Sequence, residues 1–584
     1  MWVNPLRYFR DNVATMNHGA RGMHASSLAT RPMADQPVWR QVAQALCDHG
    51  AIRCFGLVGG ANFKVTHALT ELGIPFVSAR HEGGAVTMAD ASARLTGALT
   101  IVSVTAGPGL TNAITGIGEA AKSDTPLVIL AGDVPVGDRT SSFSIRQEDL
   151  VRSVGASWIQ IDEPSSSYRS VREAAAHALR ERQVVVISLP TDVQEQMSEA
   201  GPWSPLDSLT PPQPDDTAID AVVDMIRTAR RPLILAGHGA DVADAESLLD
   251  RLAGAVDGLL ATSLQAHGMF ADHPWNLGIA GGYASPAASD LIRQSDLVIV
   301  FGASLNMWTT KNGRLIRNDT RIVQVESRAG RFGRFSEVAL RIHGDAAQTA
   351  RRILEALAAS GSSPIGRWRT PEVAAVIHDK SHRHLIYGDR SDGRYIDPRT
   401  FTKAVDAILP ADRIVVLDGG HFTGWPIHHL SVPNAGSFCI PIAFQSIGLG
   451  LAAAVGASVS FPQRLVVLAA GDGGFLMSLA ELETAVRLDC RMCILIYNDA
   501  AYSAEVHHFK HGYALDIVRF PETDFARAAR GLGADGATIR KPEDLAALKA
   551  WVERGAPGVF VVDARVDPDI AADWFMQVIG KGNL

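Results

Sequence analysis

Two aspartates lie just past the ends of two expected strands, where they could bind a metal ion. Asp472 follows the apolar run 465–470 and Asp499 follows the apolar run 492–497, and short runs of this kind are typical of buried parallel strands. The carboxyl ends of neighbouring strands in an open α/β sheet face one crevice, where ligands bind. We therefore expect Asp472 and Asp499 to lie close together. Carboxylate oxygens, completed by water and phosphate oxygens, are the ligands that Mg2+ prefers.

Glycines next to Asp472 suit the approach of a diphosphate. Gly471 precedes the aspartate, and Gly473 and Gly474 follow it at the expected start of a helix whose apolar residues recur at steps of three and four. Glycine carries no side chain that would block an anion, and the free N–H groups at a helix N-terminus attract phosphate. An ordinary strand–helix–strand unit with a glycine turn is the alternative.

The same segment carries a family resemblance. Gly471-Asp472-Gly473, then residues 474–497, then Asn498-Asp499 is similar to the thiamine diphosphate signature of the superfamily of 2-oxoacid decarboxylases and acetolactate synthases. The family usually has a second asparagine where this chain has Asp499, and an aspartate still offers an oxygen, with more charge. The resemblance implies that Asp472, Asp499 and the backbone carbonyl of Ala501 bind Mg2+.

A third acid lies near the front of the chain. Glu82 opens an expected helix within the stretch RHEGGAVTMADASARLTG, which resembles the family segment whose glutamate bonds to the aminopyrimidine ring of thiamine diphosphate. The resemblance implies that Glu82 is catalytic; a plain charge at a helix N-terminus, favoured by the helix dipole, is the alternative. Asn112, in the next resembling segment, is equally well explained as a simple cap or turn residue or as a substrate contact.

The resemblance adds five weaker candidates. Gln147 lies in a segment similar to a loop that approaches the cofactor, and Gly420 and His421 follow a strand end where they could contact the diphosphate. Ile447 takes the position of the bulky residue that holds the cofactor in its bent conformation. His507 follows the metal-binding segment and is a candidate acid-base group, with a solvated histidine as the alternative.

Strand and helix patterns alternate along most of the chain and predict an α/β fold with three doubly wound parallel-sheet domains. Proline-rich and Gly/Ser-rich stretches at 202–214 and 358–397 read as linkers. The expected order is a disordered or additional N-terminal extension (1–34), a pyrimidine-binding domain (35–200), a central Rossmann-like domain (216–357) and a diphosphate-binding domain (396–584).

The central domain shows an incomplete nucleotide-binding pattern. Its turn Gly237-His238-Gly239 falls short of a full dinucleotide fingerprint, and Glu326 ends a strand at a place where an acid could hold a ribose. FAD or an adenine nucleotide is compatible with this pattern. An empty site, without FAD, is the expectation.

Composition excludes several classes of protein. The chain has 584 residues, of which 47% are hydrophobic and 20% charged, and its net charge is -8, so neither nucleic acid nor an anionic membrane is an expected partner. No apolar run reaches the roughly 18–20 residues that span a bilayer. Five cysteines are too few for a disulfide framework, which favours a reducing, cytoplasmic location.

The resemblance covers nearly the whole chain and implies an enzyme that depends on thiamine diphosphate and Mg2+ and makes or breaks a C–C bond next to a carbonyl. An acetolactate synthase-like carboligase acting on a 2-oxo acid or hydroxy-ketone is the first hypothesis. A non-ligating 2-oxoacid decarboxylase or a 2-hydroxyacyl lyase is the alternative, and a catalytically silent thiamine-binding subunit is a rival of another class. In the family the glutamate of one subunit meets the diphosphate domain of another, which implies a homodimer or homotetramer.

Overall fold

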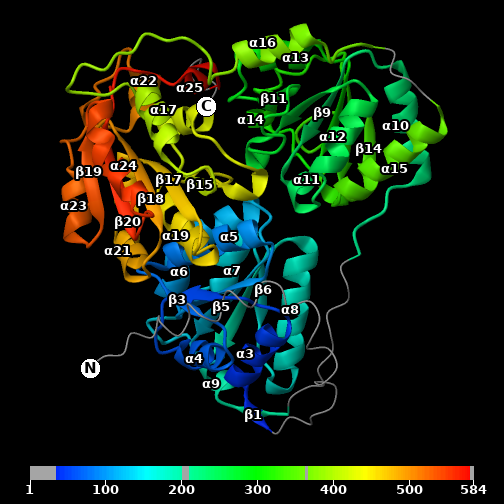
Figure 1. Cartoon of the computed structure of the whole chain (residues 1–584). Coiled ribbons are helices and arrows are strands. Elements are labelled where there is room, and N and C mark those ends of the chain that lie inside the picture. The colour runs from blue at the N-terminus through cyan, green and yellow to red at the C-terminus, as the bar shows by residue number, and fades with distance from the viewer. Residues whose placement is uncertain (1–34, 200–209, 362–365, 579–584) are drawn as a thin grey trace.

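The computed structural model describes residues 35–199, 210–361 and 366–578, which form three lobes (Figure 1). The expected extension at 1–34 and part of the first expected linker lie outside these residues. In Figure 1 the N-terminal domain lies at the bottom, the central domain at the upper right and the C-terminal domain at the upper left. No helix of the described residues is both long and apolar enough to cross a membrane.

The N-terminal domain is built on six parallel strands in the order β3-β2-β4-β5-β7-β6. A separate short antiparallel pair joins the two ends of the domain, β1 (Gln36–Pro37) with β8 (Met197–Ser198). The strands are β2 (Cys54–Gly56), β3 (Phe76–Ser78), β4 (Thr100–Val104), β5 (Leu127–Asp133), β6 (Ser157–Gln160) and β7 (Val184–Pro190), and the helices are α3 (Val38–Asp48), α4 (Phe63–Glu71), α5 (Glu82–Thr96), α6 (Pro108–Lys122), α7 (Gln147–Ser153), α8 (Ser167–Glu181) and α9 (Thr191–Gln194).

The central domain repeats this architecture with the strand order β11-β10-β9-β12-β13-β14, again all parallel. Its strands are β9 (Pro232–Ala236), β10 (Leu259–Thr262), β11 (Asn276–Ile279), β12 (Leu297–Phe301), β13 (Arg321–Glu326) and β14 (Leu340–His343), and its helices are α10 (Asp216–Thr228), α11 (His238–Val242), α12 (Glu246–Ala255), α13 (Pro286–Gln294), α14 (Met307–Thr310) and α15 (Ala346–Ala359).

The C-terminal domain has the strand order β16-β15-β17-β18-β20-β19, and its pairs are parallel as well. Its strands are β15 (Arg413–Leu417), β16 (Phe438–Cys439), β17 (Leu465–Gly471), β18 (Met492–Asn498), β19 (Asp535–Ile539) and β20 (Val559–Arg565), and its helices are α17 (Pro398–Ile408), α18 (Gly424–His429), α19 (Gly450–Ser460), α20 (Asp472–Met477), α21 (Ala480–Arg487), α22 (Ser503–Phe509), α23 (Phe525–Gly531), α24 (Ala546–Glu553) and α25 (Asp573–Val578).

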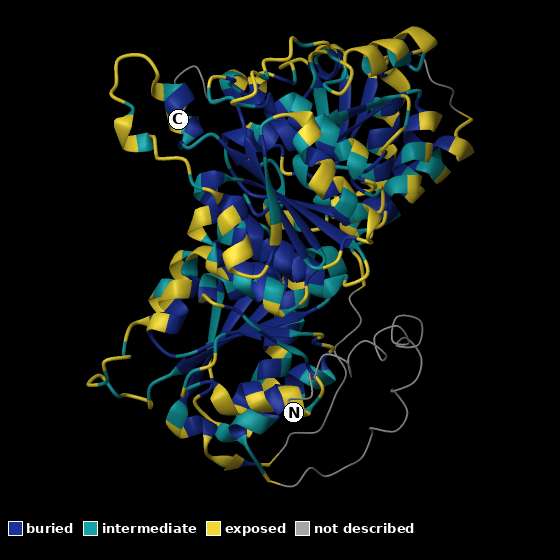
Figure 2. Cartoon of the chain, turned by 60° about the vertical axis from the view of Figure 1, so that its left-hand side comes forward, coloured by how far each residue is buried: buried dark blue, intermediate teal, exposed yellow. Residues whose placement is uncertain are grey.

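These three sheets confirm the predicted α/β class. Their inner strands are buried on both faces, as the dark blue interior in Figure 2 shows, because helices cover each side of a parallel sheet. Two local predictions were wrong. The single helix expected after Gly474 is divided into α20 and α21, and the N–H of Ser478 closes α20 by bonding to the carbonyl of Phe475 (3.2 Å). The second expected linker contains a helix, α16 (Pro371–Asp379), which Thr370 caps.

The N- and C-terminal domains share one apolar core, which extends from the N-terminal sheet through α5 and α19 to the C-terminal sheet. Helices α5 and α19 face each other across the boundary (Figure 1). They approach so closely that a Cβ on Gly456 would lie 2.1 Å from the backbone oxygen of Met88. The two domains are therefore fixed against each other within one chain.

We expect Gly456→Ala to lower the free energy of unfolding by about 1–3 kcal/mol, because the added methyl meets backbone that must move. Chemical denaturation of the variant and of Gly531→Ala measures this. Gly531 is an exposed residue at the end of α23 with nothing within 4 Å of its added Cβ, so its variant should match the wild type. Equal stability of the two variants would contradict the close helix contact.

Candidate functional site

Asp472 and Asp499 lie at the carboxyl ends of neighbouring strands. Strands β17 and β18 are paired in parallel, and the last pair in register joins Gly471 to Tyr497. Asp472 is the first residue of α20, and Asp499 follows the last residue of β18. The structure therefore brings together the two aspartates that the strand pattern placed side by side.

The two carboxylates disfavour each other's charge. Burial, and then the neighbouring Asp499, raises the pKa of Asp472 to about 8. Burial also raises the pKa of Asp499 to about 6, although Ser503 donates a hydrogen bond to its Oδ2. Two close carboxylates out of bulk water cannot both ionise without cost, and a divalent cation between them removes that cost.

This donor set fits Mg2+, provided that further oxygens complete it. Within residues 35–199, 210–361 and 366–578, no group of three His, Cys, Asp or Glu side chains could hold a metal ion. Magnesium commonly binds through one or two carboxylates together with water and phosphate oxygens, so a pair is sufficient. The buried Ala501, which follows the left-handed Ala500 (φ 56°), offers its backbone carbonyl two residues after Asp499.

The glycines around Asp472 keep three loops in close contact. A Cβ on Gly474 would lie 2.6 Å from Asp418 Oδ2, and a Cβ on Gly473 would lie 2.6 Å from the ring of Tyr502. Asp418 is fully buried and accepts hydrogen bonds from the N–H groups of Gly419 (2.8 Å) and Gly448 (3.0 Å). Burial raises the pKa of this carboxyl to about 6. Sequence reasoning assigned no role to Asp418, although its place before two glycines at a strand end was a signal.

Gly420 and Ile447 lie on the loops that Asp418 ties together. Gly420 adopts a φ of 143°, a conformation that favours glycine. The side chain of Ile447 remains 36% exposed, and its Cγ2 would be 3.3 Å from a Cβ on Gly419. An apolar side chain held at this loop with so much exposure is available to contact a ligand.

The structure also brings together His421 and His507, whose ring centroids are 4.6 Å apart. His421 Nε2 accepts a hydrogen bond from the N–H of Ala572 (2.7 Å), so this nitrogen is already used by the C-terminal segment. Burial, and then His507, lowers the pKa of His421 to about 3. Burial, with Lys510 nearby, also lowers the pKa of His507. His507 Nε2 is buried and has no hydrogen-bond partner among the described residues, so His507 has the free nitrogen of the pair.

Gln147 is the first residue of α7, directly after the loop that precedes this helix, and it is buried. Its Nε2 donates to the carbonyl of Gly132 at 3.3 Å. Its Oε1 is buried and, within the described residues, accepts no hydrogen bond. The amide is thus anchored through its nitrogen and leaves an acceptor unused.

Glu82 is the first residue of α5 and is 8% exposed. Asn112 on α6 donates from Nδ2 to Glu82 Oε2 at 3.0 Å, so Asn112 is neither a cap nor a simple turn residue. In the part of the chain that the structure describes, no hydrogen bond or ion pair joins Glu82 to Asp472 or Asp499. Glu82 lies in the N-terminal domain and the aspartate pair in the C-terminal domain, so each of these domains presents one part of the candidate site, here called a half-site.

A cavity of about 1400 Å³ lies among the three domains. It opens past the ends of β9, β12 and β13, where Gly239, Gly302 and Glu326 line it, and it reaches Phe444 of the C-terminal domain. Burial raises the pKa of Glu326. The expectation that no FAD occupies this domain stays a prediction, which the visible absorption spectrum of the purified protein tests.

Comparison with known proteins follows this division into domains. Residues 38–152, 219–353 and 418–564 match the family models described as the N-terminal TPP binding, central and C-terminal TPP binding domains of thiamine pyrophosphate enzymes. A sulfoacetaldehyde acetyltransferase of Rhodobacter capsulatus is 26% identical over 561 residues, which cover 91% of this chain and 95% of the relative. An acetolactate synthase large subunit of Parasynechococcus marenigrum is 29% identical over 526 residues, which cover 86% and 84%. A catabolic acetolactate synthase of Raoultella terrigena is 28% identical over 547 residues, which cover 89% and 94%.

The raised pKa values of the aspartate pair predict how stability depends on pH without divalent cations. Between about pH 4 and pH 8 the folded state binds more protons at this pair than the unfolded state does, so the free energy of unfolding falls as the pH rises. Asp499→Asn removes one titrating group and also removes the negative charge that helps to raise the pKa of Asp472. We therefore expect the variant to gain stability relative to the wild type as the pH rises towards 8.

Denaturant unfolding in a chelator at several pH values measures this difference. Asp149→Asn, which alters an exposed carboxylate, is the control and should follow the wild type. Added Mg2+ should stabilise the wild type at pH 8 more than it stabilises Asp499→Asn. A wild type that gains stability relative to Asp499→Asn as the pH rises would contradict the electrostatics of this pair.

Proposed function

Because this chain belongs to the superfamily of thiamine diphosphate-dependent enzymes, within its acetolactate synthase-like branch, we propose that it is a Mg2+-dependent carboligase acting on a 2-oxo acid. The observation that carries the choice of metal is the pair of neighbouring carboxylates, the buried Asp472 and the partly buried Asp499, which a divalent cation would neutralise. The backbone carbonyl of Ala501 and phosphate oxygens would complete the coordination.

The loops around Asp418 would hold the cofactor. Gly471, Gly473 and Gly474 let Phe422, Tyr502 and Asp418 approach the start of α20 closely, where the diphosphate would bind beside the metal. Gly420 and His421 lie at the adjacent strand end. Ile447 would pack against the cofactor from its own loop. When bound, thiamine diphosphate supplies an electron sink that lets a bond next to a carbonyl break or form, and the protein supplies orientation and electrostatics.

Glu82 would act at the cofactor's aminopyrimidine ring. Asn112 occupies its Oε2, and no residue in the described ranges donates a hydrogen bond to its Oε1, so Oε1 is the oxygen free to hold a proton there. His507 would be an acid-base group for substrate or product, because its buried Nε2 is unpaired and its lowered pKa keeps the ring neutral. Gln147 would offer its unused Oε1 to the substrate.

The complete site would require two copies of the chain. Exposed apolar side chains lie next to both half-sites: Phe143 (50%) and Ile145 (41%) shortly before Gln147, and Leu476 (46%) and Met477 (55%) shortly after Asp472. Apolar surface of this kind marks interaction sites. We propose a homodimer, or a homotetramer built from it, in which Glu82 of one subunit meets the diphosphate-binding loops of the other.

Group transfer is preferred to simple decarboxylation because the relatives are named as acetolactate synthases and acetyltransferases. A 2-oxoacid decarboxylase or 2-hydroxyacyl lyase would use the same cofactor and metal residues, so only the product distinguishes these activities. A catalytically silent subunit is disfavoured by the family's transferase and lyase activities and by the presence of Glu82 together with both aspartates.

We expect the purified protein, supplied with thiamine diphosphate and Mg2+, to release CO2 from at least one 2-oxo acid and to form a ligated product with an acceptor carbonyl. A panel of 2-oxo acids, with and without acceptor aldehydes and ketones, tests this by CO2 release and product analysis. CO2 without a ligated product would favour the decarboxylase. No turnover of any 2-oxo acid or hydroxy-ketone would contradict the proposal.

Replacing the front acid should separate binding from catalysis. Glu82→Gln keeps the size of the side chain but cannot hold the proton in the same way, so we expect kcat to fall by about 10²- to 10⁴-fold. The affinity for thiamine diphosphate should remain near that of the wild type, because the metal and diphosphate residues are unchanged. Steady-state kinetics and cofactor titration measure the two effects, and Glu71→Gln, at an exposed ion pair, is the control. Full activity of Glu82→Gln would rule out the role given to Glu82.

A further inference from the structure

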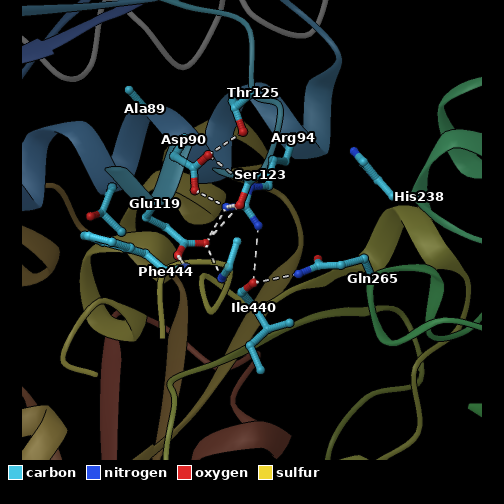
Figure 3. Close-up of polar contacts among 12 residues, drawn as sticks. Ala89, Asp90, Arg94, Glu119, Ser123, Thr125, His238, Gln265, Ile440 and Phe444 are labelled. Carbon is cyan, nitrogen blue, oxygen red and sulfur yellow. Dashed lines mark hydrogen bonds and ion pairs between the residues drawn. The ribbon is translucent and has the colours of Figure 1, made fainter. Parts of the chain in front are cut away.

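A carboxylate of the N-terminal domain holds two backbone N–H groups of the C-terminal domain. Glu119, on α6, is completely buried and accepts hydrogen bonds from the N–H of Ala443 (3.0 Å) and of Phe444 (2.7 Å). Its Oε1 also accepts from Arg94 (2.9 Å) and Ser123 (3.0 Å), which fix the carboxylate in place. Figure 3 shows Glu119 between Arg94 and the loop that carries Phe444.

A carboxylate of the C-terminal domain makes the reverse contact. Glu481, on α21, is 2% exposed and accepts hydrogen bonds from the N–H of Arg80 (3.1 and 3.2 Å) and of His81 (3.0 Å). Thr484 donates to its Oε2 at 2.7 Å. Both carboxylates are buried, and both contacts are charge-assisted and made to consecutive backbone donors, which makes them stronger than ordinary neutral hydrogen bonds.

Each contact lies directly upstream of a proposed cofactor residue. His81 immediately precedes Glu82, and Phe444 lies three positions before Ile447. The far end of the Ile447 loop is held by Asp418, which accepts the N–H of Gly448. The C-terminal domain thus fixes the backbone next to Glu82, and the N-terminal domain fixes the backbone of the loop that carries Ile447.

The sequence leaves space for both contacts. A Cβ on Gly84 would lie 2.3 Å from Glu481 Oε1, and a Cβ on Gly118 would lie 2.9 Å from the ring of Phe444. Both glycines lie within helices, where glycine costs stability relative to alanine. The close approach of the two domains explains why glycine occupies both positions, since a larger residue would collide with the facing domain.

We propose that Glu119 and Glu481 are positioning residues, one for the Ile447 loop and one for Glu82. The inference rests on the proposed function, because it assumes that Glu82 and Ile447 contact thiamine diphosphate. Neither carboxylate would touch the cofactor. Loss of either contact would displace a cofactor residue while leaving the metal and diphosphate residues unchanged.

The Glu481 contact is tested with Glu481→Gln. In the wild type, two backbone N–H groups and one hydroxyl donate to two carboxylate oxygens, whereas the amide of the variant offers them one acceptor oxygen. We expect proton exchange at the cofactor ring carbon, followed by NMR in D2O on the loaded enzyme, to slow by up to about 100-fold, because small misplacements of a reacting group are costly. The dissociation constant for thiamine diphosphate should not change. Glu483→Gln is the matched control, because Glu483 lies on the same helix and forms ion pairs at the surface with the side chains of Arg80 and Arg487.

Gly84→Ala is the second variant, because its methyl displaces the Glu481 carboxylate without removing its charge. It should reproduce the slow exchange of Glu481→Gln, so the test survives if one variant fails to fold.

The Glu119 contact is tested with Glu119→Gln, which should weaken cofactor binding by about 10-fold or more, in the range known for residues that orient ligands indirectly. Asp90→Asn alters the same buried cluster without touching the loop, so it should lower the melting temperature and leave the cofactor dissociation constant unchanged.

Thiamine diphosphate binding by the wild type, measured by fluorescence quenching, separates the two levels of the proposal. A wild type that binds no cofactor would overturn the proposed function and this inference together. A wild type that binds, with exchange rates in Glu481→Gln and Gly84→Ala and cofactor affinity in Glu119→Gln all equal to the wild type, would overturn the positioning roles alone. Equal effects of Glu483→Gln and Glu481→Gln would assign the contact a purely structural role.

Discussion

Two carboxylates that are held close together away from bulk water impose the main constraint on this structure. Asp472 and Asp499 are brought together by the parallel register of β17 and β18, and the pKa of each is raised because burial disfavours its charge. Such a pair is costly unless a cation neutralises it. The surrounding glycines, the left-handed Ala500 and the buried Asp418 all shape the loops around this pair.

The position of the front acid depends on how the domains pack. The N- and C-terminal domains share one apolar core through α5 and α19, and Glu119 and Glu481 add polar contacts in both directions across the same boundary. This rigid arrangement fixes Glu82 relative to the rest of its own chain. In the described residues Glu82 is held by Asn112, on a neighbouring helix of the same domain. The site that we propose draws its metal and diphosphate residues from a second copy of the chain.

Much of the fold was predictable because parallel strands are buried on both faces and appear in the sequence as short apolar runs. The proximity of Asp472 and Asp499 followed from the same rule. Two local features were missed, the break between α20 and α21 and the helix α16. They depend on single hydrogen bonds at helix ends, such as the cap by Thr370, which the average composition of a segment does not indicate. The contact between Glu82 and Asn112 and that between His421 and His507 join different elements, and no local periodicity encodes such pairs.

The central claim is that Glu82 of one subunit and the aspartate pair of another form one site. The most direct measurement is the activity of a heterodimer that carries Glu82→Gln in one chain and Asp472→Asn in the other, purified through a different tag on each chain. In such a dimer both substitutions would fall in one site, and the other site would keep both wild-type residues. We therefore expect the heterodimer to have about half of the wild-type activity, although the homodimer of each variant is inactive. A heterodimer as inactive as both parents would show that each site lies within a single chain and would contradict the claim.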